Sequence, residues 1–302
     1  MPITLPSISR RQFLATSAAT GLGLILGPDL LRGEETSTDP HRFALLSDTH
    51  IAADPKAHDR GVVMAENLKR VSNEVVTLAP KPAAVLVNGD CAYHTGETAD
   101  YETFLGLIRP MREHGLPMHL TLGNHDDRDR FWATLPQSEE HAKPLPHRQI
   151  VVSEAPRANW IMLDSLDKTN HTPGLLGPKQ IDWLRSALDE RKDKPAIVLV
   201  HHQPDQRKLA SGLLDTKALL DVVLPRKQVK ALLYGHTHEW DVTRRDELHC
   251  INLPTVAYVF AKGQPSGWVD CNLREDGMSI ELRCIDTSHP KHGEKHDLIW
   301  RS

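Results

Sequence analysis

Two kinds of hydrophobic pattern alternate along this chain. Short apolar runs bounded by turn residues are typical of buried strands, and they occur at residues 43–46, 83–87, 118–122, 150–152, 160–163, 196–200 and 229–234. Apolar residues at helical spacing occur at residues 61–78, 101–114, 178–192 and 215–224. Strands and helices that alternate in this way predict a layered α/β fold.

The last part of the chain has a different pattern. From Trp240 to Trp300 it reads as short strands and turns without clear helices, with a hairpin predicted around Asp276-Gly277. No repeat, linker or low-complexity stretch interrupts residues 40–302, so these residues are predicted to form one domain. Residues 1–39 are predicted to be a signal and linker outside that domain.

The N-terminal stretch reads as a targeting signal. Arg10 and Arg11 precede a mildly apolar, Ala- and Gly-rich run from Phe13 to Leu26, too short to span a bilayer comfortably. This arrangement resembles a twin-arginine export signal, with a basic N-terminus or an interfacial helix as the alternative. The resemblance implies contact with the twin-arginine export machinery and a periplasmic or secreted protein. It implies no stable membrane insertion after export, or a membrane anchor if the signal stays uncleaved.

Composition narrows the class of partner. The 302 residues are 39% hydrophobic and 25% charged with a net charge of −4, which is ordinary for a soluble globular protein. A nucleic-acid partner is not expected, because such proteins usually carry a basic face and aromatic stacking platforms, and aromatic residues make up only 5% of this chain. The sequence carries no signature of an oligomeric state.

The four cysteines do not form a zinc motif. They are Cys91, Cys250, Cys271 and Cys284, and none has the C-x-x-C spacing of a zinc knuckle. Cys271 and Cys284 flank the predicted hairpin turn and could lie near each other across two strands. Unlinked core thiols are the commoner outcome in a domain of this size.

Five of the apolar runs end in polar motifs of similar composition. The motifs are Ser47-Asp48-Thr49-His50, Asn88-Gly89-Asp90, Gly123-Asn124-His125-Asp126, His201-His202 and Gly235-His236-Thr237-His238. Because the carboxyl ends of strands gather on one rim of a layered α/β fold, these loops are expected to converge. Carboxylates, an amide and several imidazoles in one place require neutralisation, which divalent metal ions provide.

The motifs offer mixed nitrogen and oxygen ligands without thiolate. The candidate metal ligands are Asp48, His50, Asp90, Asn124, His201, His236 and His238. Asp48 and His50 can reach one ion together, whereas the carboxylate of Asp90 can bridge two ions. His236 and His238 lie on opposite sides of an extended segment, so each could face a different ion. This ligand set suits two divalent ions of Mn, Fe, Zn or Co.

The remaining polar residues of the motifs suggest a hydrolytic reaction. Two ions about 3.5–4 Å apart would clamp a phosphoryl group and convert a bridging water to hydroxide at neutral pH. His125 is then available as the proton carrier, with Asp126 beside it to fix its tautomer. His94 follows Asp90 closely and is a candidate contact for the phosphate or the leaving group.

Other polar residues near the motifs have simpler interpretations. His202 is expected to point away from the ion that His201 binds. Asp127 and Arg128 are expected to start a helix, and Asp164 to support the fold.

The complete motif set has a family resemblance. D-x-H, G-D, G-N-H-D, H and G-H-x-H, in this order and at these distances, resemble the calcineurin-like metallophosphoesterases from Phe43 to His238. Gly-Asn-His-Asp-Asp-Arg followed by Phe131, and Leu163-Asp164-Ser165 followed by Gln180 and Trp183-Leu184, resemble the class III cyclic nucleotide phosphodiesterase and glycerophosphodiesterase group within that superfamily.

This resemblance implies a fold and a division of the ligands. The family fold is a four-layer αββα sandwich of two mixed sheets flanked by helices, in which the strand-rich C-terminal part would form the second sheet. One metal would be held by Asp48, His50, Asp90 and His238. The other would be held by Asp90, Asn124, His201 and His236.

One motif also fits a neighbouring family. Gly89-Asp90-Cys91-Ala92-Tyr93 matches the G-D-x-x-Y of purple acid phosphatases, in which the tyrosine ligates ferric iron. Those enzymes pair it with D-x-G, whereas His50 occupies that place here. Tyr93 is therefore expected to pack or to contact substrate.

The sequence thus predicts a binuclear-metal phosphoesterase. It would hydrolyse phosphodiester or phosphomonoester bonds of a small substrate by attack of a metal-bridging hydroxide. The alternatives are a phosphomonoesterase or nucleotide pyrophosphohydrolase of the same superfamily, and a non-enzymatic binding protein on this fold. No motif residue is missing, which disfavours the binding protein.

Overall fold

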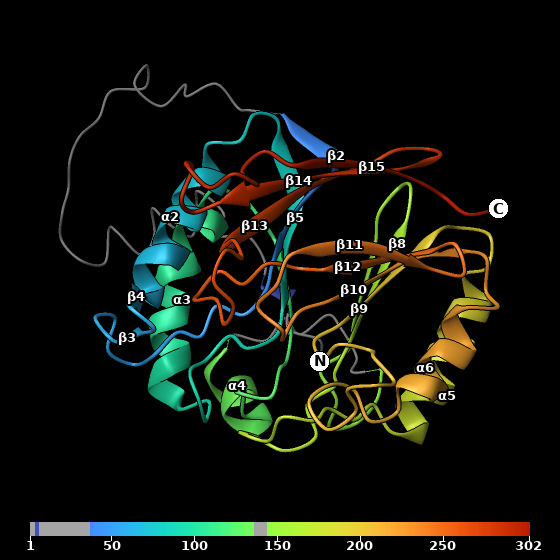
Figure 1. The fold of residues 1–302 in the computed structure, drawn as a ribbon, viewed down its shortest axis with the longest axis horizontal. Coiled ribbons are helices and arrows are strands. Elements are labelled where there is room, and N and C mark those ends of the chain that lie inside the picture. The colour runs from blue at the N-terminus through green and yellow to red at the C-terminus, as the bar shows by residue number, and fades with distance from the viewer. Residues whose placement is uncertain (1–3, 6–36, 136–143) are drawn as a thin grey trace, which may run out of the picture.

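Two β-sheets lie face to face between two layers of helices in the computed structural model, which describes residues 4–5, 37–135 and 144–302 (Figure 1). One side is covered by α2 (Met64–Val76) and α3 (Thr98–Glu113), and the other by α5 (Pro178–Glu190) and α6 (Thr216–Val223) (Figure 1). This arrangement confirms the mixed α/β sandwich expected from the sequence.

The first sheet combines a parallel centre with an antiparallel extension. Its strand order is β1 (Thr4–Leu5), β6 (Met118–Thr121), β5 (Lys81–Asn88), β2 (Thr38–Leu46), β13 (Gly267–Leu273), β14 (Gly277–Cys284) and β15 (Lys295–Ile299). Strands β2, β5 and β6 run parallel, whereas β13, β14 and β15 are antiparallel to their neighbours. β2 begins inside the stretch that the sequence analysis assigned to the linker.

The second sheet is built from the middle of the chain. Its order is β11 (Asp241–Arg245), β12 (Leu248–Asn252), β10 (Val229–Tyr234), β9 (Ala196–Val200), β8 (Asn159–Leu163) and β7 (Val151–Glu154). The expectation that the C-terminal part would form this sheet is wrong for β13, β14 and β15. They extend the first sheet, because β13 pairs with β2 and sets Cys271 opposite Phe43.

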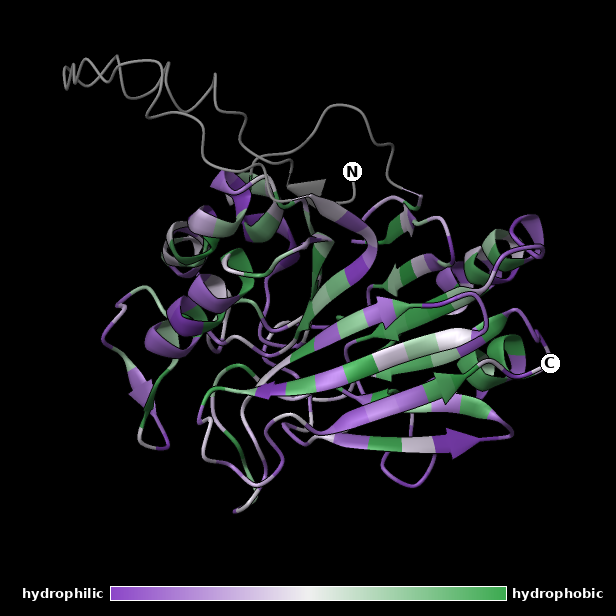
Figure 2. Cartoon of the chain, turned by 90° about the horizontal axis from the view of Figure 1, so that it is seen from above, coloured by the Kyte–Doolittle hydropathy of each residue, from purple (hydrophilic) through white to green (hydrophobic). Residues whose placement is uncertain are grey.

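Three hydrophobic layers hold the four structural layers together. Along β2, Phe43 and Leu45 pack between the sheets, whereas Ala44 and Leu46 pack beneath α2 and α3. Successive side chains of a strand point to opposite faces, so a continuous apolar run fills two layers at once. Figure 2 shows hydrophobic and hydrophilic residues alternating along several strands.

Two helices in the first half of the chain have starts that local contacts explain. The predicted helix at residues 61–78 starts only at Met64, because β3 (His58–Asp59) and β4 (Val62–Val63) pair as a hairpin that turns at Arg60 and Gly61, both with positive φ. A short helix, α4 (Arg128–Thr134), follows the third polar motif, and the side chain of Asp127 caps it by accepting from the backbone N–H of Arg130.

The twin-arginine segment, residues 9–26, lies outside the described residues. Within the described part of the chain, none of the helices is both long and apolar enough to cross a bilayer. The four cysteines are buried and free. Cys271 lies opposite Ile280 and Cys284 opposite Gly267, so the predicted hairpin forms without placing the two thiols across from each other.

Candidate metal centre

Five loops meet at one rim of the two sheets. They follow β2, β5 and β6 of the first sheet and β9 and β10 of the second, and these strands run parallel within each sheet. The loops form four overlapping groups whose ligand atoms lie within 4.8 Å of one another: Asp48–His50–His238, His50–Asp90–His125, Asp48–Asp90–His201 and His201–His202–His236. The convergence predicted from the motifs is confirmed.

The first group joins the loops after β2 and β10. Nε2 of His238 lies 3.4 Å from Oδ1 of Asp48 and 3.0 Å from Nε2 of His50. The backbone carbonyl of Tyr258 accepts from Nδ1 of His238, which turns Nε2 toward the carboxylate. All three ligand side chains are buried. These residues form a group that could hold a divalent ion.

Asp90 lies between the two predicted ion positions. One of its carboxylate oxygens is 3.6 Å from Nε2 of His50 and 3.3 Å from Nε2 of His201. Its other oxygen accepts from the backbone N–H of His125 at 2.8 Å. The carbonyl of Asn88 lies 2.8 Å from Nδ1 of His201 and orients that ring. This position suits a carboxylate that bridges two ions.

Two buried polar atoms lie at the second ion position that the sequence predicts. Oδ1 of Asn124 has no hydrogen-bond partner in the described chain, and Nε2 of His201, 3.3 Å from an oxygen of Asp90, makes no hydrogen bond of normal geometry there. Buried polar atoms are almost always satisfied, so such orphans require an explanation. An oxygen and an imidazole nitrogen are both ligands of divalent transition metals. The residues of this rim therefore fit a metal centre.

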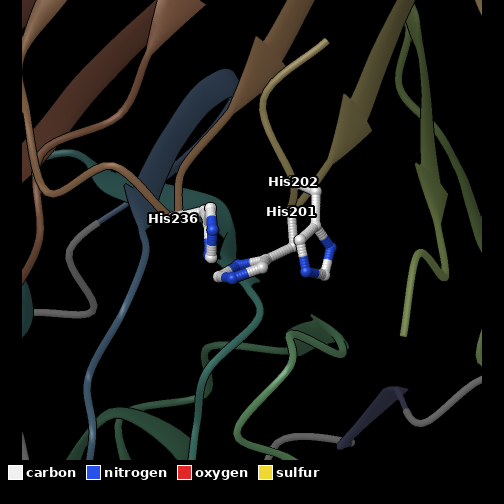
Figure 3. Close-up of side chains that lie close together, drawn as sticks. All are labelled: His201, His202 and His236. Atoms are coloured by element: carbon white, nitrogen blue, oxygen red, sulfur yellow. The ribbon is translucent and has the colours of Figure 1, made fainter. Parts of the chain in front are cut away.

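His236 and His202 complete the cluster around His201. Nε2 of His236 lies 2.7 Å from the carbonyl of Ser211, which leaves Nδ1 free to face an ion. His202 was expected to point away, but its ring centroid lies 5.0 Å from that of His201 and 4.7 Å from that of His236 (Figure 3). Nδ1 of His202 is 2.8 Å from Oγ of Ser165. His202 is thus a neighbour of the predicted ligands.

The backbone of the predicted ligands is strained. Five of them adopt positive φ: Asp48 (54°), His50 (46°), Asp90 (47°), His236 (69°) and His238 (55°). Each such residue costs about 1–2 kcal/mol when it is not glycine. Strain of this kind persists where the surrounding structure holds side chains in a functional arrangement.

Glycines allow the loops to approach one another. A Cβ at Gly123 would lie 2.6 Å from Nε2 of His201 and would also collide with the carboxylate of Asp90. A Cβ at Gly235 would lie 2.6 Å from Oδ2 of Asp48. The two positions therefore exclude any side chain, which explains the glycines in two of the motifs.

Burial and the opposite charges set the protonation of the site. Burial alone would raise the pKa of Asp48, but His201 and His238 outweigh it and hold that pKa below its ordinary value. Burial would lower the pKa of His201, yet Asp90 and Asp48 raise it to about 10. Burial lowers the pKa of His50 to about 3. A divalent ion would replace the proton of His201, because metal ligands bind deprotonated.

His125 lies at the open side of the centre, but its partner differs from the prediction. Nδ1 of His125 is 2.9 Å from the carbonyl oxygen of His94, and that backbone carbonyl orients the ring. The carboxylate of Asp126 instead accepts from the backbone N–H groups of Cys91, Ala92 and Gly123. The tautomer role given to Asp126 is therefore corrected: its fully buried carboxylate holds two of the motif loops together.

The contacts of three further polar residues bear on the roles predicted for them. His94 is exposed, with its ring centroid 5.9 Å from that of His125, so its role as a substrate contact stays a prediction. The hydroxyl of Tyr93 donates to Asp59 at 3.2 Å and is thereby engaged away from an iron-ligand role. Asp164 accepts from Arg128 at 2.9 Å and supports the fold, as expected.

The loop after β12 also contributes to the site and was not predicted from the motifs. Tyr258 supplies the carbonyl that orients His238, and the ring of Phe260 stacks on the His238 ring with the centroids 4.1 Å apart. This loop carries no motif of its own. Its aromatic residues, in a chain with few aromatics, were the available signal.

Comparisons with known proteins agree with this geometry. The calcineurin-like phosphoesterase profile matches residues 41–240. A 3′,5′-cyclic adenosine monophosphate phosphodiesterase of Pseudomonas aeruginosa is 29% identical over 74% of this chain and 79% of its own length. A probable glycerophosphodiester phosphodiesterase of Arcobacter nitrofigilis is 25% identical over 78% of this chain and 82% of its own length.

A solved structure has the same fold. A dimetal phosphatase from Danio rerio superposes with a TM-score of 0.66 at 14% identity, covering 86% of this chain and 99% of its own. The family profile spans residues 41–240, which include all five polar motifs. The site that these motifs form carries aspartate and histidine side chains that could hold a metal ion. The chain therefore belongs to the calcineurin-like phosphoesterase family and is a metal-dependent phosphoester hydrolase.

Proposed function

We propose that this protein hydrolyses phosphodiesters with a pair of divalent metal ions. The observation that carries the proposal is the convergence of two carboxylates and several imidazoles from five strand ends, with ligand atoms within 4.8 Å of one another in each group. The names of two relatives, a cyclic nucleotide phosphodiesterase and a probable glycerophosphodiester phosphodiesterase, support a diester substrate.

The ligands divide as two overlapping sets. Asp48, His50 and His238 would hold one ion and Asn124, His201 and His236 the other, with Asp90 shared between them. When bound, the ions would supply charge neutralisation for the phosphoryl oxygens and activation of water for in-line attack. Mn, Fe, Zn and Co all suit these nitrogen and oxygen ligands.

The protein's own groups orient the substrate and handle the proton. His125 is partly exposed, its Nδ1 is held by the His94 carbonyl, and its Nε2 is left to face the departing oxygen. In this proposal His125 protonates or stabilises the leaving alkoxide. His94, exposed beside it, contacts the phosphate or the leaving group.

A substrate panel combined with metal analysis tests this proposal. Purified protein should contain stoichiometric transition metal, and it should hydrolyse bis(p-nitrophenyl) phosphate and cyclic AMP faster than p-nitrophenyl phosphate and UDP-sugars. Faster turnover of p-nitrophenyl phosphate would favour a phosphomonoesterase, and faster turnover of UDP-sugars a pyrophosphohydrolase. Metal-loaded protein that cleaves none of the four substrates would contradict the proposal.

We further propose that the stretch before β2 contains a twin-arginine export signal, which would place the enzyme in the periplasm or outside the cell, or anchor it to the membrane if the signal stays uncleaved. The support is the Arg10-Arg11 pair followed by a short apolar run. The full chain with both arginines replaced by lysine should accumulate in the cytoplasmic fraction. Equal distribution of the two forms would count against export by this route.

A further inference from the structure

An exposed aromatic ring borders the metal centre on the His238 side. Phe260 is 51% exposed, and its ring stacks on that of His238 with an interplanar angle of 14°. A single exposed apolar ring is ordinary at a protein surface, but this one lies directly against a predicted metal ligand. A phosphate bound at the metal centre would place its substituents within reach of this ring.

An arginine from a separate loop lies over the same ring. The guanidinium carbon of Arg60 is 5.1 Å from the centroid of Phe260 and 5.8 Å from that of Tyr258. Arg60 is exposed, at the turn of the β3–β4 hairpin with φ of 49°. The neighbouring Asp59 accepts from Tyr93, and within the described residues no carboxylate forms an ion pair with Arg60.

We propose that Phe260 and Arg60 bind a planar aromatic substituent of the phosphodiester, such as a nucleobase, beside the metal centre. This inference rests on the proposed diesterase function and concerns the specificity of the same site. His238 stacks on the Phe260 ring and Arg60 lies over it, so a base would stack on the guanidinium plane that the ring supports from beneath. An aliphatic substituent such as glycerol has no flat π-face and gains little from this pair.

The contribution of the base can be isolated with two inhibitors. AMP and ribose 5-phosphate carry the same phosphate and sugar and differ by the adenine. Their inhibition constants are measured against hydrolysis of bis(p-nitrophenyl) phosphate by the metal-loaded enzyme. We expect AMP to bind roughly 10-fold more tightly than ribose 5-phosphate, which is the order of one stacking contact.

Variants then locate that contribution. Phe260→Ala and Phe260→Leu should bring the ratio of the two inhibition constants close to one, because both remove the ring and the second keeps apolar volume. Arg60→Lys should lower the ratio in part, since an ammonium lacks the guanidinium plane. Ile299→Ala is a matched control, because Ile299 is 52% exposed on β15, and it should leave the ratio unchanged.

Failure of the aromatic site and failure of the diesterase function give different results. If a Phe260 variant also displaced His238, both inhibitors would bind more weakly by the same factor. The ratio of their inhibition constants therefore reports the contribution of the base alone. No hydrolysis of bis(p-nitrophenyl) phosphate by the native enzyme would refute the diesterase function itself. Active enzyme with a native ratio near one, or with a high ratio unchanged in Phe260→Ala, would overturn only the aromatic site.

Discussion

Asn124 and His125 are adjacent in the chain but occupy different chemical positions. Oδ1 of Asn124 is a buried oxygen without a hydrogen-bond partner in the described chain, whereas the ring of His125 is partly exposed and oriented by a backbone carbonyl. An oxygen that needs a partner fits a metal ligand. A partly exposed imidazole fits a group that exchanges protons with substrate.

This difference predicts that the two alanine variants fail in different ways. Asn124→Ala should lower the amount of bound metal, because it removes a proposed ligand of the second ion. His125→Ala should keep its metal and lower kcat by about 10²–10⁴, the usual loss for a general acid or base. Metal analysis and steady-state kinetics measure both effects, with the exposed and distant His114→Ala as control. Equal metal loss in both variants would contradict this division.

His249 predicts a pH effect on stability that is separate from the metal centre. Its Nε2 donates to the carbonyl of Ile299 at 2.7 Å, and burial lowers its pKa, with a smaller contribution from Arg244 and Arg301. As pH falls through about 6.5, His249 takes up a proton in the unfolded chain but stays neutral in the folded chain. The free energy of unfolding therefore decreases.

The measurement is the change in Tm between about pH 7.5 and about pH 5.5. We expect a smaller change in His249→Gln than in the native protein, because glutamine has no proton to gain. A variant whose Tm falls as much as the native Tm over this interval would show that His249 is not a source of acid sensitivity.

The candidate ligands were recognisable from the sequence because their side-chain types recur at strand ends. The contact between His125 and His94 was not, because it uses a backbone carbonyl that is positioned by a φ of 55° at His94. The role of Asp126 was misassigned for a related reason. Adjacency in sequence suggested a contact with His125, but the carboxylate turns inward to three backbone N–H groups.

At the scale of elements, the loops after the parallel strands approach closely only where glycine permits. Gly123 follows β6 and lies against Asp90 and His201. Gly123→Ala should therefore displace these ligands, reduce bound metal and lower activity by about 100-fold, because small misplacements of reacting groups are costly.

A glycine on the neighbouring helix provides the control. Gly106 lies in α3 and is exposed, and a Cβ added there would meet open space. Gly106→Ala should keep full activity and raise the free energy of unfolding by about 0.5–1 kcal/mol, because alanine favours helix. Activity assays and chemical denaturation of both variants test the pair. Normal activity in Gly123→Ala would contradict the close approach.

The strands and helices of the parallel core were predictable because their apolar patterns are regular. The sheet to which β13, β14 and β15 belong was not, since the pattern of a strand does not identify its neighbour. β13 pairs with β2, more than two hundred residues earlier in the chain. The β3–β4 hairpin was also missed, because its two-residue strands fall below the length at which alternation is visible.

For the molecule as a whole, the metal centre joins the two sheets. Asp48, Asp90 and Asn124 follow strands of the first sheet, whereas His201 and His238 follow strands of the second. Bound ions would therefore connect both sheets and stabilise the folded state. The gain is about 2.7 kcal/mol for each site when the free ion is at 100 times its Kd.

The most direct test of the proposed binuclear-metal phosphodiesterase activity is removal and return of the metal in one preparation. Chelator-treated protein should lose hydrolysis of bis(p-nitrophenyl) phosphate together with a fall in Tm, and addition of Mn²⁺, Zn²⁺, Fe²⁺ or Co²⁺ should restore both, with activity rising until about two ions are bound per chain. Undiminished hydrolysis by protein shown by metal analysis to be free of transition metal would contradict the account.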